Sequence, residues 1–157
     1  MDSIASVVDP VMVIVTVAHE GERSGCLVGF HSQSSIHPVR WAVWLSKANH
    51  THGIAARASM LAVHFPSEDD CDLASLFGEQ TGDAVDKFDR CDWTEGLDGL
   101  PLLDRIPTRI VGAIVSRHDD GGDHECFVVD AANVDNPKPL RPLTFNAVRD
   151  FDAGHPA

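Results

Sequence analysis

Basic residues are scarce in this sequence. The chain of 157 residues has 12 lysines and arginines against 24 aspartates and glutamates, so its formal net charge is −12 at pH 7. Nucleic acids and anionic membranes bind basic protein surfaces, because their phosphate groups need cations. The charge therefore argues against both as partners. It is typical of a soluble protein whose surface repels other copies of itself.

Cysteine pairs and long apolar runs are missing as well. The four cysteines are widely scattered, and no CxxC spacing occurs. This pattern predicts free cysteines and argues against a disulfide framework or a thiolate zinc site. No run approaches the roughly 18 apolar residues of a membrane-spanning helix. The N-terminus MDSIASVVDP lacks the basic and apolar parts of a secretory signal. We expect a cytoplasmic protein.

What the chain does contain is a series of β-prone runs. Its length fits a single domain over residues 1–157. Apolar, β-branched segments predict strands at 10–18, 26–30, 41–46, 60–66, 108–117 and 125–134, with a short last strand at 142–146. Segments 48–60 and 67–80 have helix-start signals and apolar stripes. We predict a mainly β protein, a barrel with two or more short helices.

Three segments lack a regular pattern. The polar, serine-rich stretch HSQSSIHP at 31–38 is predicted to be a loop or the lining of a polar site. Residues 81–101 are rich in glycine and acids and are expected to be irregular. The stretch HDDGGDH at 118–124 separates two long β-rich runs, so Gly121 and Gly122 predict a hairpin turn. His124 then follows the turn, where a solvated loop does not need an imidazole.

Two of the polar segments have the residue types of an anion-binding site. Gly29 and nearby serines combine a flexible backbone with small hydroxyl groups, and Lys47 supplies a cation close to a helix start. The serines are Ser32, Ser34 and Ser35, and the residues that accompany Lys47 are Asn49 and Thr51. Neither segment contains GxGxxG or GxxxxGK[ST]. Residue types alone therefore leave two readings open, a surface loop pair and a binding site.

Other chemistries have weaker sequence support. A metal site is an alternative, built from the histidines at 50 and 52 or from the acids and histidines of 118–124. There is no HExxH motif and no EF-hand loop, however, and a helix would direct residues 50 and 52 apart. No GxSxG nucleophile elbow is present either. We assign no metal ligands from the sequence.

Three landmarks in order resemble the flavin reductase-like family, whose fold is the FMN-binding split barrel. They are GCLVGFHSQSSIHPV at 25–39, DKF at 86–88 with WTEGLDGLPLLD at 93–104, and GDH at 122–124. SKANHT at 46–51 matches the place where the family binds the flavin phosphate. The resemblance covers roughly residues 8 to 145. Leu27 stands where the family often has threonine, which removes one hydroxyl from the expected flavin contacts.

The resemblance implies a set of site residues. Those expected to bind the flavin are Val28, Gly29, Phe30, Ser32, Ser34, Ser35, Ser46, Lys47, Asn49 and Thr51. His124 matches the family histidine that is thought to help dock the nicotinamide, and Asp123 is expected to orient it through a hydrogen bond. For Asp86 and Lys87 we expect a structural role, an ion pair and an aromatic anchor beside the site.

The implied activity is NAD(P)H:flavin oxidoreduction. Hydride would pass from NADH or NADPH to FMN, or to FAD, and the protein would stack and orient the two rings. A homodimer is implied, and a monooxygenase could receive the reduced flavin. A rival hypothesis is a flavin- or deazaflavin-binding module without turnover. A metal-binding β-barrel is the third.

Overall fold

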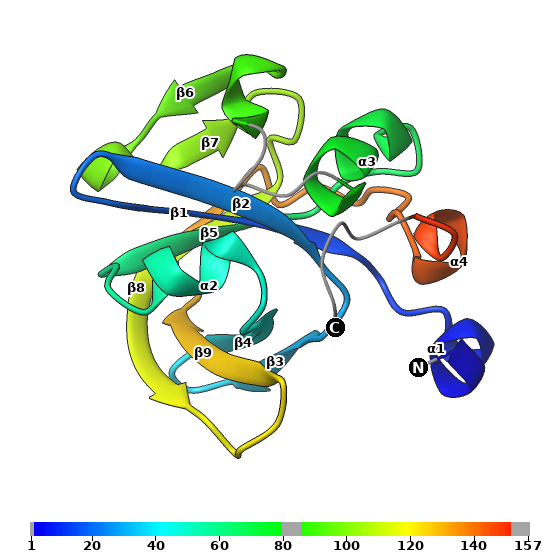
Figure 1. Cartoon of the computed structure of the whole chain (residues 1–157), viewed down its shortest axis with the longest axis horizontal. Coiled ribbons are helices and arrows are strands. Elements are labelled where there is room, and N and C mark those ends of the chain that lie inside the picture. The colour runs from blue at the N-terminus through cyan, green and yellow to red at the C-terminus, as the bar shows by residue number, and fades with distance from the viewer. Residues whose placement is uncertain (1, 80–85, 152–157) are drawn as a thin grey trace.

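The computed structural model describes residues 2–79 and 86–151, drawn in Figure 1. The helices are α1 (Asp2–Val8), α2 (His50–Ala55), α3 (Cys71–Glu79) and α4 (Phe145–Val148), with 3-10 turns η1 (Lys87–Asp89) and η2 (Leu97–Gly99). The strands are β1 (Val13–His19), β2 (Glu22–Val28), β3 (His31–Ser35), β4 (Arg40–Ser46), β5 (Met60–His64), β6 (Trp93–Glu95), β7 (Pro101–Leu103), β8 (Arg109–His118), β9 (His124–Asp130) and β10 (Val134–Asp135). The prediction of a mainly β split barrel with short helices is confirmed.

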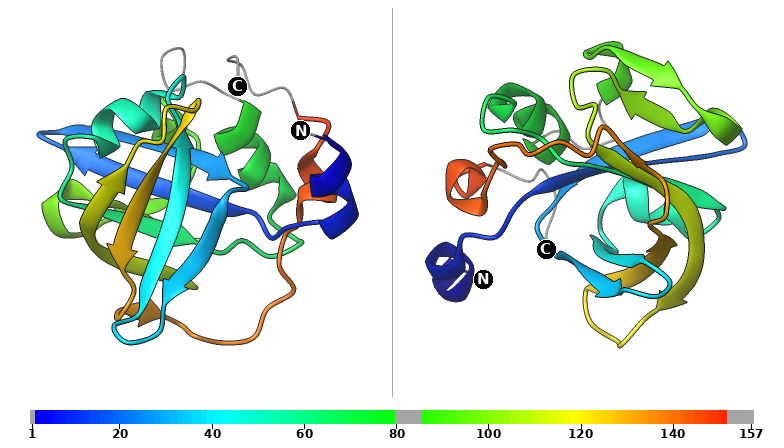
Figure 2. Two further views of the ribbon diagram at one scale, coloured as in Figure 1. Left: turned by 90° about the horizontal axis from the view of Figure 1, so that it is seen from below. Right: turned by 180° about the vertical axis from the view of Figure 1, so that it is seen from behind.

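One antiparallel sheet forms the body of the protein. Its order is β2-β1-β5-β8-β9-β4-β3, and β10 pairs with β8. The long strand β8 pairs with β5 along its first half and with β9 along its second, and it curls between them (Figure 2). Gly112 allows the end of β9 to approach β8 closely, because a β-carbon there would collide with the backbone oxygen of Asp130. The sheet therefore closes on itself except between β2 and β3.

The gap between β2 and β3 is the split of the barrel. Val28 ends β2 opposite Val13, and His31 begins β3 opposite Val43. Only Gly29 and Phe30 connect the two strands, so the chain crosses from one half of the sheet to the other within two residues. The His31 ring fastens the crossing, because its Nε2 lies 2.6 Å from the backbone oxygen of Val11.

Apolar side chains fill the space on both sides of the β1–β2 hairpin. Inside the barrel, Val15, Leu61 and Phe127 belong to a fully buried cluster that α2 covers. On the other face of the hairpin, Phe77 from α3 packs with Phe88 in a second cluster. Burying a side chain of this size stabilises the fold by about 1.5–3 kcal/mol each. The β1–β2 hairpin is therefore packed on both of its faces.

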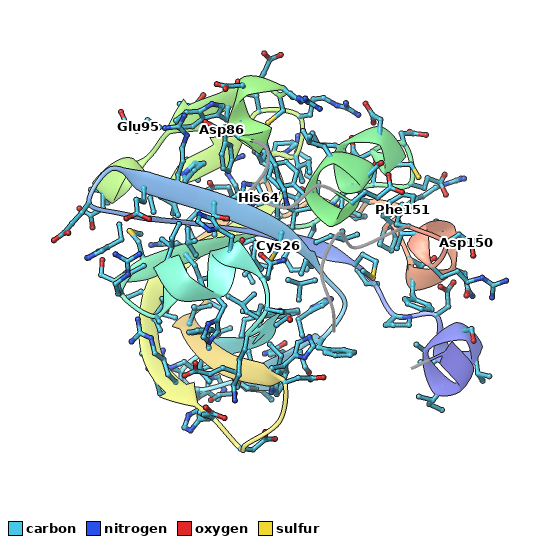
Figure 3. All side chains as sticks on the ribbon, in the orientation of Figure 1. Cys26, His64, Asp86, Glu95, Asp150 and Phe151 are labelled. Carbon is cyan, nitrogen blue, oxygen red and sulfur yellow. The ribbon has the colours of Figure 1, made fainter. Side chains whose placement is uncertain are left out.

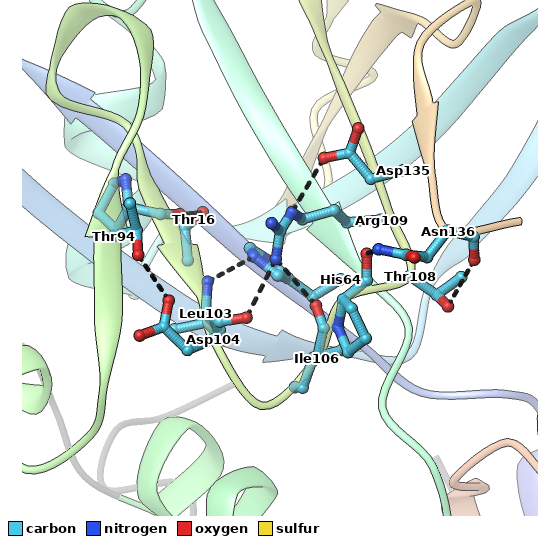
Figure 4. A network of polar contacts seen from close by, with 12 residues as sticks. Thr16, His64, Thr94, Leu103, Asp104, Ile106, Thr108, Arg109, Asp135 and Asn136 are labelled. Carbon is cyan, nitrogen blue, oxygen red and sulfur yellow. Dashed lines mark hydrogen bonds and ion pairs between the residues drawn. The ribbon is translucent and has the colours of Figure 1, made fainter.

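A polar network fastens the β6–β7 hairpin and the segment after it to the sheet (Figure 4). The Arg109 guanidinium donates to the backbone oxygens of Leu103 and Ile106 at 3.1 Å each, and to Asp135 at 3.2 Å. The fully buried His64 accepts a hydrogen bond at Nε2 from the Leu103 amide, 3.0 Å away. The polar atoms of His64 and Arg109 thus find hydrogen-bond partners, as buried polar groups in folded proteins generally do.

The structure corrects several sequence predictions. The strand predicted at 26–30 begins earlier, at Glu22, because Glu20 and Gly21 both take positive φ angles and form a two-residue turn after β1. The stretch 31–38 contributes strand β3, because pairing with β4 satisfies its backbone despite its serines. The segment predicted to be irregular holds the β6–β7 hairpin, and its residues 81–85 lie outside the described part. The last predicted strand is wrong, since Pro142 and Thr144 make only isolated bridges and α4 follows.

No helix within residues 2–79 and 86–151 is long and apolar enough to span a membrane.

Candidate functional site

A cavity of about 480 Å³ opens at the split of the barrel. The crossing at Gly29 and Phe30, the end of β4, the β8–β9 turn and the α4 segment surround it. Its lining residues are Met12, Cys26, Leu27, Val28, Gly29, Phe30, Trp44, Ser46, Asn49, Phe77, Gly78, Asp123, His124, Phe145, Val148, Arg149 and Phe151. Small-molecule sites of proteins commonly have volumes of about 300–1,000 Å³. The cavity is therefore large enough for a cofactor.

One wall of the cavity is apolar. Met12 and Leu27 lie on it beside α3 and α4, and Phe151 follows α4 close to Gly78. Figure 3 shows Phe151 at the end of α4, on the same side of the barrel as α3. A β-carbon at Gly78 would lie 2.8 Å from the Leu27 side chain, so the helix approaches the strand closely there. This wall can pack against one face of a flat aromatic ligand.

Two rings stand side by side at the mouth of the cavity. Phe30 is 39% exposed, which is high for a phenylalanine in a folded protein. Its ring centroid lies 4.9 Å from that of His124, with the planes tilted by 56°. The pair joins the crossing segment of the split to the first residue of β9. A ligand in the cavity would therefore meet an exposed aromatic surface next to an imidazole.

The β8–β9 turn places and orients His124. Asp119 and Asp120 each accept a hydrogen bond from the glycine amide two residues later, at 2.8 and 2.9 Å, and Gly121 takes a φ of +91°. The Asp123 carboxylate lies 2.7 Å from Nδ1 of His124, and this contact holds the pKa of Asp123 below its ordinary value. Because a carboxylate accepts, Nδ1 carries the hydrogen, and Nε2 is left for a ligand.

The turn after β4 forms the polar end of the cavity. Ser46 and Asn49 line it, and the backbone amide of Lys47 donates to the backbone oxygen of Asp123 at 2.9 Å. Asn49 caps α2 by accepting from the Thr51 amide at 3.0 Å. The two turns at the rim are thus bonded to each other, and both present polar groups to the same space.

The sequence model of the family described as "Flavin reductase like domain" matches residues 4–153. The chain belongs to this family. A curated relative, the ferric-chelate reductase (NAD(P)H) of Archaeoglobus fulgidus, is 27% identical over 135 residues, which are 85% of this chain and 80% of that protein. The three landmarks of the sequence therefore identified the family correctly.

Solved structures share the fold. An FMN-binding protein from Thermus thermophilus aligns with a TM-score of 0.76 at 24% identity, over 85% of this chain and 74% of that one. An NADH:FAD oxidoreductase from Streptomyces globisporus, in complex with NAD and FAD fragments, aligns with a TM-score of 0.77 at 22% identity, over 96% and 86%. At these identities the likeness concerns the architecture of the split barrel.

The structure brings together part of the predicted set. The predicted residues that line the cavity are Val28, Gly29, Phe30, Ser46, Asn49 and His124. They come from β2, the crossing, the turn after β4 and the β8–β9 turn, which are far apart in sequence. The hydrogen bond expected between Asp123 and His124 is present.

The other predicted residues lie outside the cavity. Ser32, Ser34 and Ser35 belong to the edge strand β3, and none of them lines the cavity. Ser32 donates to the neighbouring Gln33 carbonyl. Thr51 is fully buried, and its hydroxyl lies 2.8 Å from that of Ser24. Lys47 sits at the rim and pairs with Asp119 at 2.7 Å. These positions depend on the course of β3 and on contacts with residues far apart in the chain. Residue types alone do not reveal either.

The expected ion pair between Asp86 and Lys87 is absent. Asp86 pairs instead with Arg23 at 3.2 Å and caps η1, so its carboxylate faces away from Lys87. Lys87 is buried and donates to the backbone oxygens of Gly25 and Phe77 at 3.1 and 2.9 Å. Its role is structural, as expected, but it fastens α3 to β2 rather than pairing with its neighbour.

Sequence reasoning missed the C-terminal part of the site. Phe145, Val148, Arg149 and Phe151 all line the cavity, although the sequence predicted a strand that ends at 146. The aromatic and apolar spacing over 145–151 was the available signal, since it fits a short helix as well as a strand. Trp44 was also missed. It lies on the opposite face of β4 from Trp41 and lines the cavity.

The residues of the metal hypothesis serve other contacts. Within 2–79 and 86–151 no three histidine, cysteine, aspartate or glutamate side chains gather in a way that could hold a metal ion. His118 lies 3.0 Å from the hydroxyl of Ser116, and His52 lies 2.8 Å from Glu125.

Proposed function

We propose that this protein is an NAD(P)H:flavin oxidoreductase that passes hydride from a nicotinamide to FMN, with FAD as the alternative flavin. The observation that carries the proposal is the cavity at the split, where an apolar wall faces the Asp123–His124 pair and a polar turn. The membership of the family and the curated NAD(P)H-dependent relative support the same reaction.

The cavity residues fit a flavin in shape and chemistry. The isoalloxazine ring system is flat and has an apolar dimethylbenzene part, which suits the wall of Met12, Leu27 and the neighbouring aromatic residues. The ribityl phosphate needs hydrogen-bond donors, and the turn with Ser46 and Asn49 provides polar groups at the other end. Gly29 keeps the crossing free of a side chain beside the ring edge. Both parts of the cofactor thus find matching surfaces within one cavity.

When bound, the flavin supplies the hydride chemistry itself, as an acceptor of two electrons from the nicotinamide. The chain's residues then have three tasks. The apolar wall would exclude water from the flavin ring. The backbone from Val28 to Phe30 would lie beside it. His124 lines the cavity and is oriented by Asp123, so its Nε2 could hydrogen-bond the nicotinamide carboxamide and help to position the nicotinamide.

A flavin titration followed by anaerobic reduction tests the proposal. The protein is titrated with FMN, FAD and a deazaflavin, and binding is read from the perturbed flavin absorbance. NADH and then NADPH are added without oxygen, and bleaching of the flavin band is followed. We expect binding and pyridine-nucleotide-dependent bleaching. Protein that binds no flavin overturns the proposal, and binding without bleaching supports the flavin-binding module instead.

An assembly can be proposed from the exposed edges of the sheet. We propose a homodimer, because the edge strands β2 and β3 need cover and the apolar side chains of Ile36 and Val39 are exposed after β3. Light scattering on the purified protein tests it, and a monomer at micromolar concentration contradicts it.

A cytoplasmic location agrees with four free cysteines, and a monooxygenase that consumes the reduced flavin is the proposed partner.

A further inference from the structure

Lys47 is bonded to the β8–β9 turn twice. Its backbone amide donates to the Asp123 oxygen, and its ammonium group lies 2.7 Å from the Asp119 carboxylate. Ser46, the residue before it, and Asp123 both line the cavity. Lys47 therefore stands at the rim where the polar end of the cavity meets the turn that carries His124.

Asp119 is prearranged to hold this lysine. Its Oδ1 atom also accepts from the Gly121 amide at 2.8 Å, so the turn fixes the carboxylate before Lys47 approaches. The side chains of Lys47 and Asp119 are 34% and 49% exposed. An ion pair in such a position can open when a stronger anion arrives, because water screens it and its net stabilisation is small.

A phosphorylated ligand in the cavity meets an acidic rim. Asp123 lines the cavity, Asp119 lies beside it on the same turn, and the whole chain carries a formal charge of −12. A phosphate dianion at the polar end needs a local cation. Lys47 lies beside that end, and Arg149 lines the cavity from the α4 segment. The Lys47 ammonium group can face Asp119 or the phosphate, and the two anions repel each other at close range.

We propose that Asp119 competes with the flavin phosphate for Lys47 and thereby lowers the preference of the site for FMN over riboflavin. The inference rests on the proposed flavin function. It makes Asp119 a specificity-determining residue that keeps the phosphate contact weak. The flavin then binds as an exchangeable substrate, as release of reduced flavin to a second enzyme requires.

The chain offers a matched control for the test. Asp119 and Asp120 are adjacent in the same turn, and each accepts from a glycine amide two residues on. Of these two carboxylates, Asp119 forms the ion pair with Lys47. Asp119→Asn and Asp120→Asn remove the same charge. Asparagine retains one side-chain oxygen, which can still accept the hydrogen bond from the glycine amide.

The experiment measures dissociation constants of FMN and riboflavin for the wild type, for D119N and D120N, and for K47M with and without D119N. We expect D119N to bind FMN about two- to fivefold more tightly, the range that opening an exposed ion pair permits, with riboflavin binding unchanged. D120N should change the FMN to riboflavin ratio less than D119N. In protein that also carries K47M, D119N should no longer strengthen FMN binding appreciably.

Two results overturn the inference and differ from failure of the proposed function. If D119N leaves the FMN to riboflavin ratio unchanged, or alters it no more than D120N does, Asp119 does not compete for Lys47. If the effect of D119N persists in K47M, general repulsion explains it instead. A protein that binds neither FMN nor riboflavin overturns the proposed function itself, and the inference with it.

Discussion

Two histidines show how the closed side of the barrel differs from its split. His64 is fully buried, and both ring nitrogens are used, since Nδ1 lies 3.1 Å from the Ile14 carbonyl and Nε2 accepts from Leu103. His124 is 23% exposed, and Asp123 engages only its Nδ1. The same side chain therefore holds strands together in one place and offers a nitrogen to a ligand in the other.

Two lysines repeat the contrast. Lys87 is buried beneath β2, and two backbone oxygens accept from its ammonium group. Burial lowers the pKa of Lys87 from its ordinary value. Lys47 lies at the rim and bonds a carboxylate that another anion can replace. Lys87, whose hydrogen bonds go to buried backbone oxygens, stabilises the fold. Lys47, whose partner is an exposed carboxylate, can take part in binding.

The largest difference should appear in stability. His64→Ala removes packing and leaves the buried Leu103 amide without its acceptor, so the free energy of unfolding should fall by about 3 kcal/mol. His124→Ala should change it by less than about 1 kcal/mol, because its partner is an exposed carboxylate. Urea unfolding followed by tryptophan fluorescence measures both. Equal losses at the two sites would contradict the division between a structural and a functional side.

Acid should destabilise the closed side through the same histidine. Burial lowers the pKa of His64 to about 3, so the folded state resists the proton that the unfolded chain takes up near its ordinary pKa of 6.5. The contribution of neutral His64 is complete above pH 6.5 and is lost as the pH falls toward 3, at about 1.4 kcal/mol per pH unit. Unfolding curves between pH 7 and 4 measure this slope. His64→Gln should show a smaller slope, and an unchanged slope would assign the effect to other groups.

At the split, the expected effect is on hydride transfer. His124→Ala should slow anaerobic reduction of bound FMN by about tenfold, the value of one lost hydrogen bond to the nicotinamide. It should weaken FMN binding much less, because the apolar wall and the polar turn remain. Stopped-flow reduction and flavin titration on the same preparation compare the two. Equal losses in rate and in affinity would show that the role of His124 is misassigned.

The smallest effect is expected from the residue that orients His124. Asp123→Asn weakens the contact with Nδ1 and should slow reduction by about two- to fivefold, in line with an exposed charge-assisted pair. Asp123→Glu, which retains the charge, should recover part of the rate. If Asp123→Asn and Asp120→Asn slow reduction equally, Asp123 does not orient His124, and the effect comes from the charge of the turn alone.

Much of this fold was predictable because its signals are local. The β-branched runs located the long strands, and Gly121 with Gly122 located the turn that precedes His124. Strand β3 escaped prediction because its serines and glutamine have low strand preference, and pairing with β4 overrides that preference. The helix at Phe145–Val148 escaped because a few apolar residues fit either period.

The site was predictable only in part, for a related reason. Residues that share a short motif with the family, such as Gly29, Ser46 and His124, line the cavity. Thr51 matches the motif equally well but points into the interior, where Ser24 meets its hydroxyl. A motif fixes which residues are near a site along the chain. It does not fix the side of the strand or helix from which each one faces the ligand.

By itself the sequence determined the family, the long strands and the turn that carries His124, because these depend on residue types and spacings within short segments. Only the tertiary structure decided that β2 and β3 part at Gly29–Phe30, that the α4 segment lines the resulting cavity, and that Asp119 holds Lys47. Those features join residues far apart in the chain. They follow from how the curled sheet brings its two halves together, which no single segment encodes.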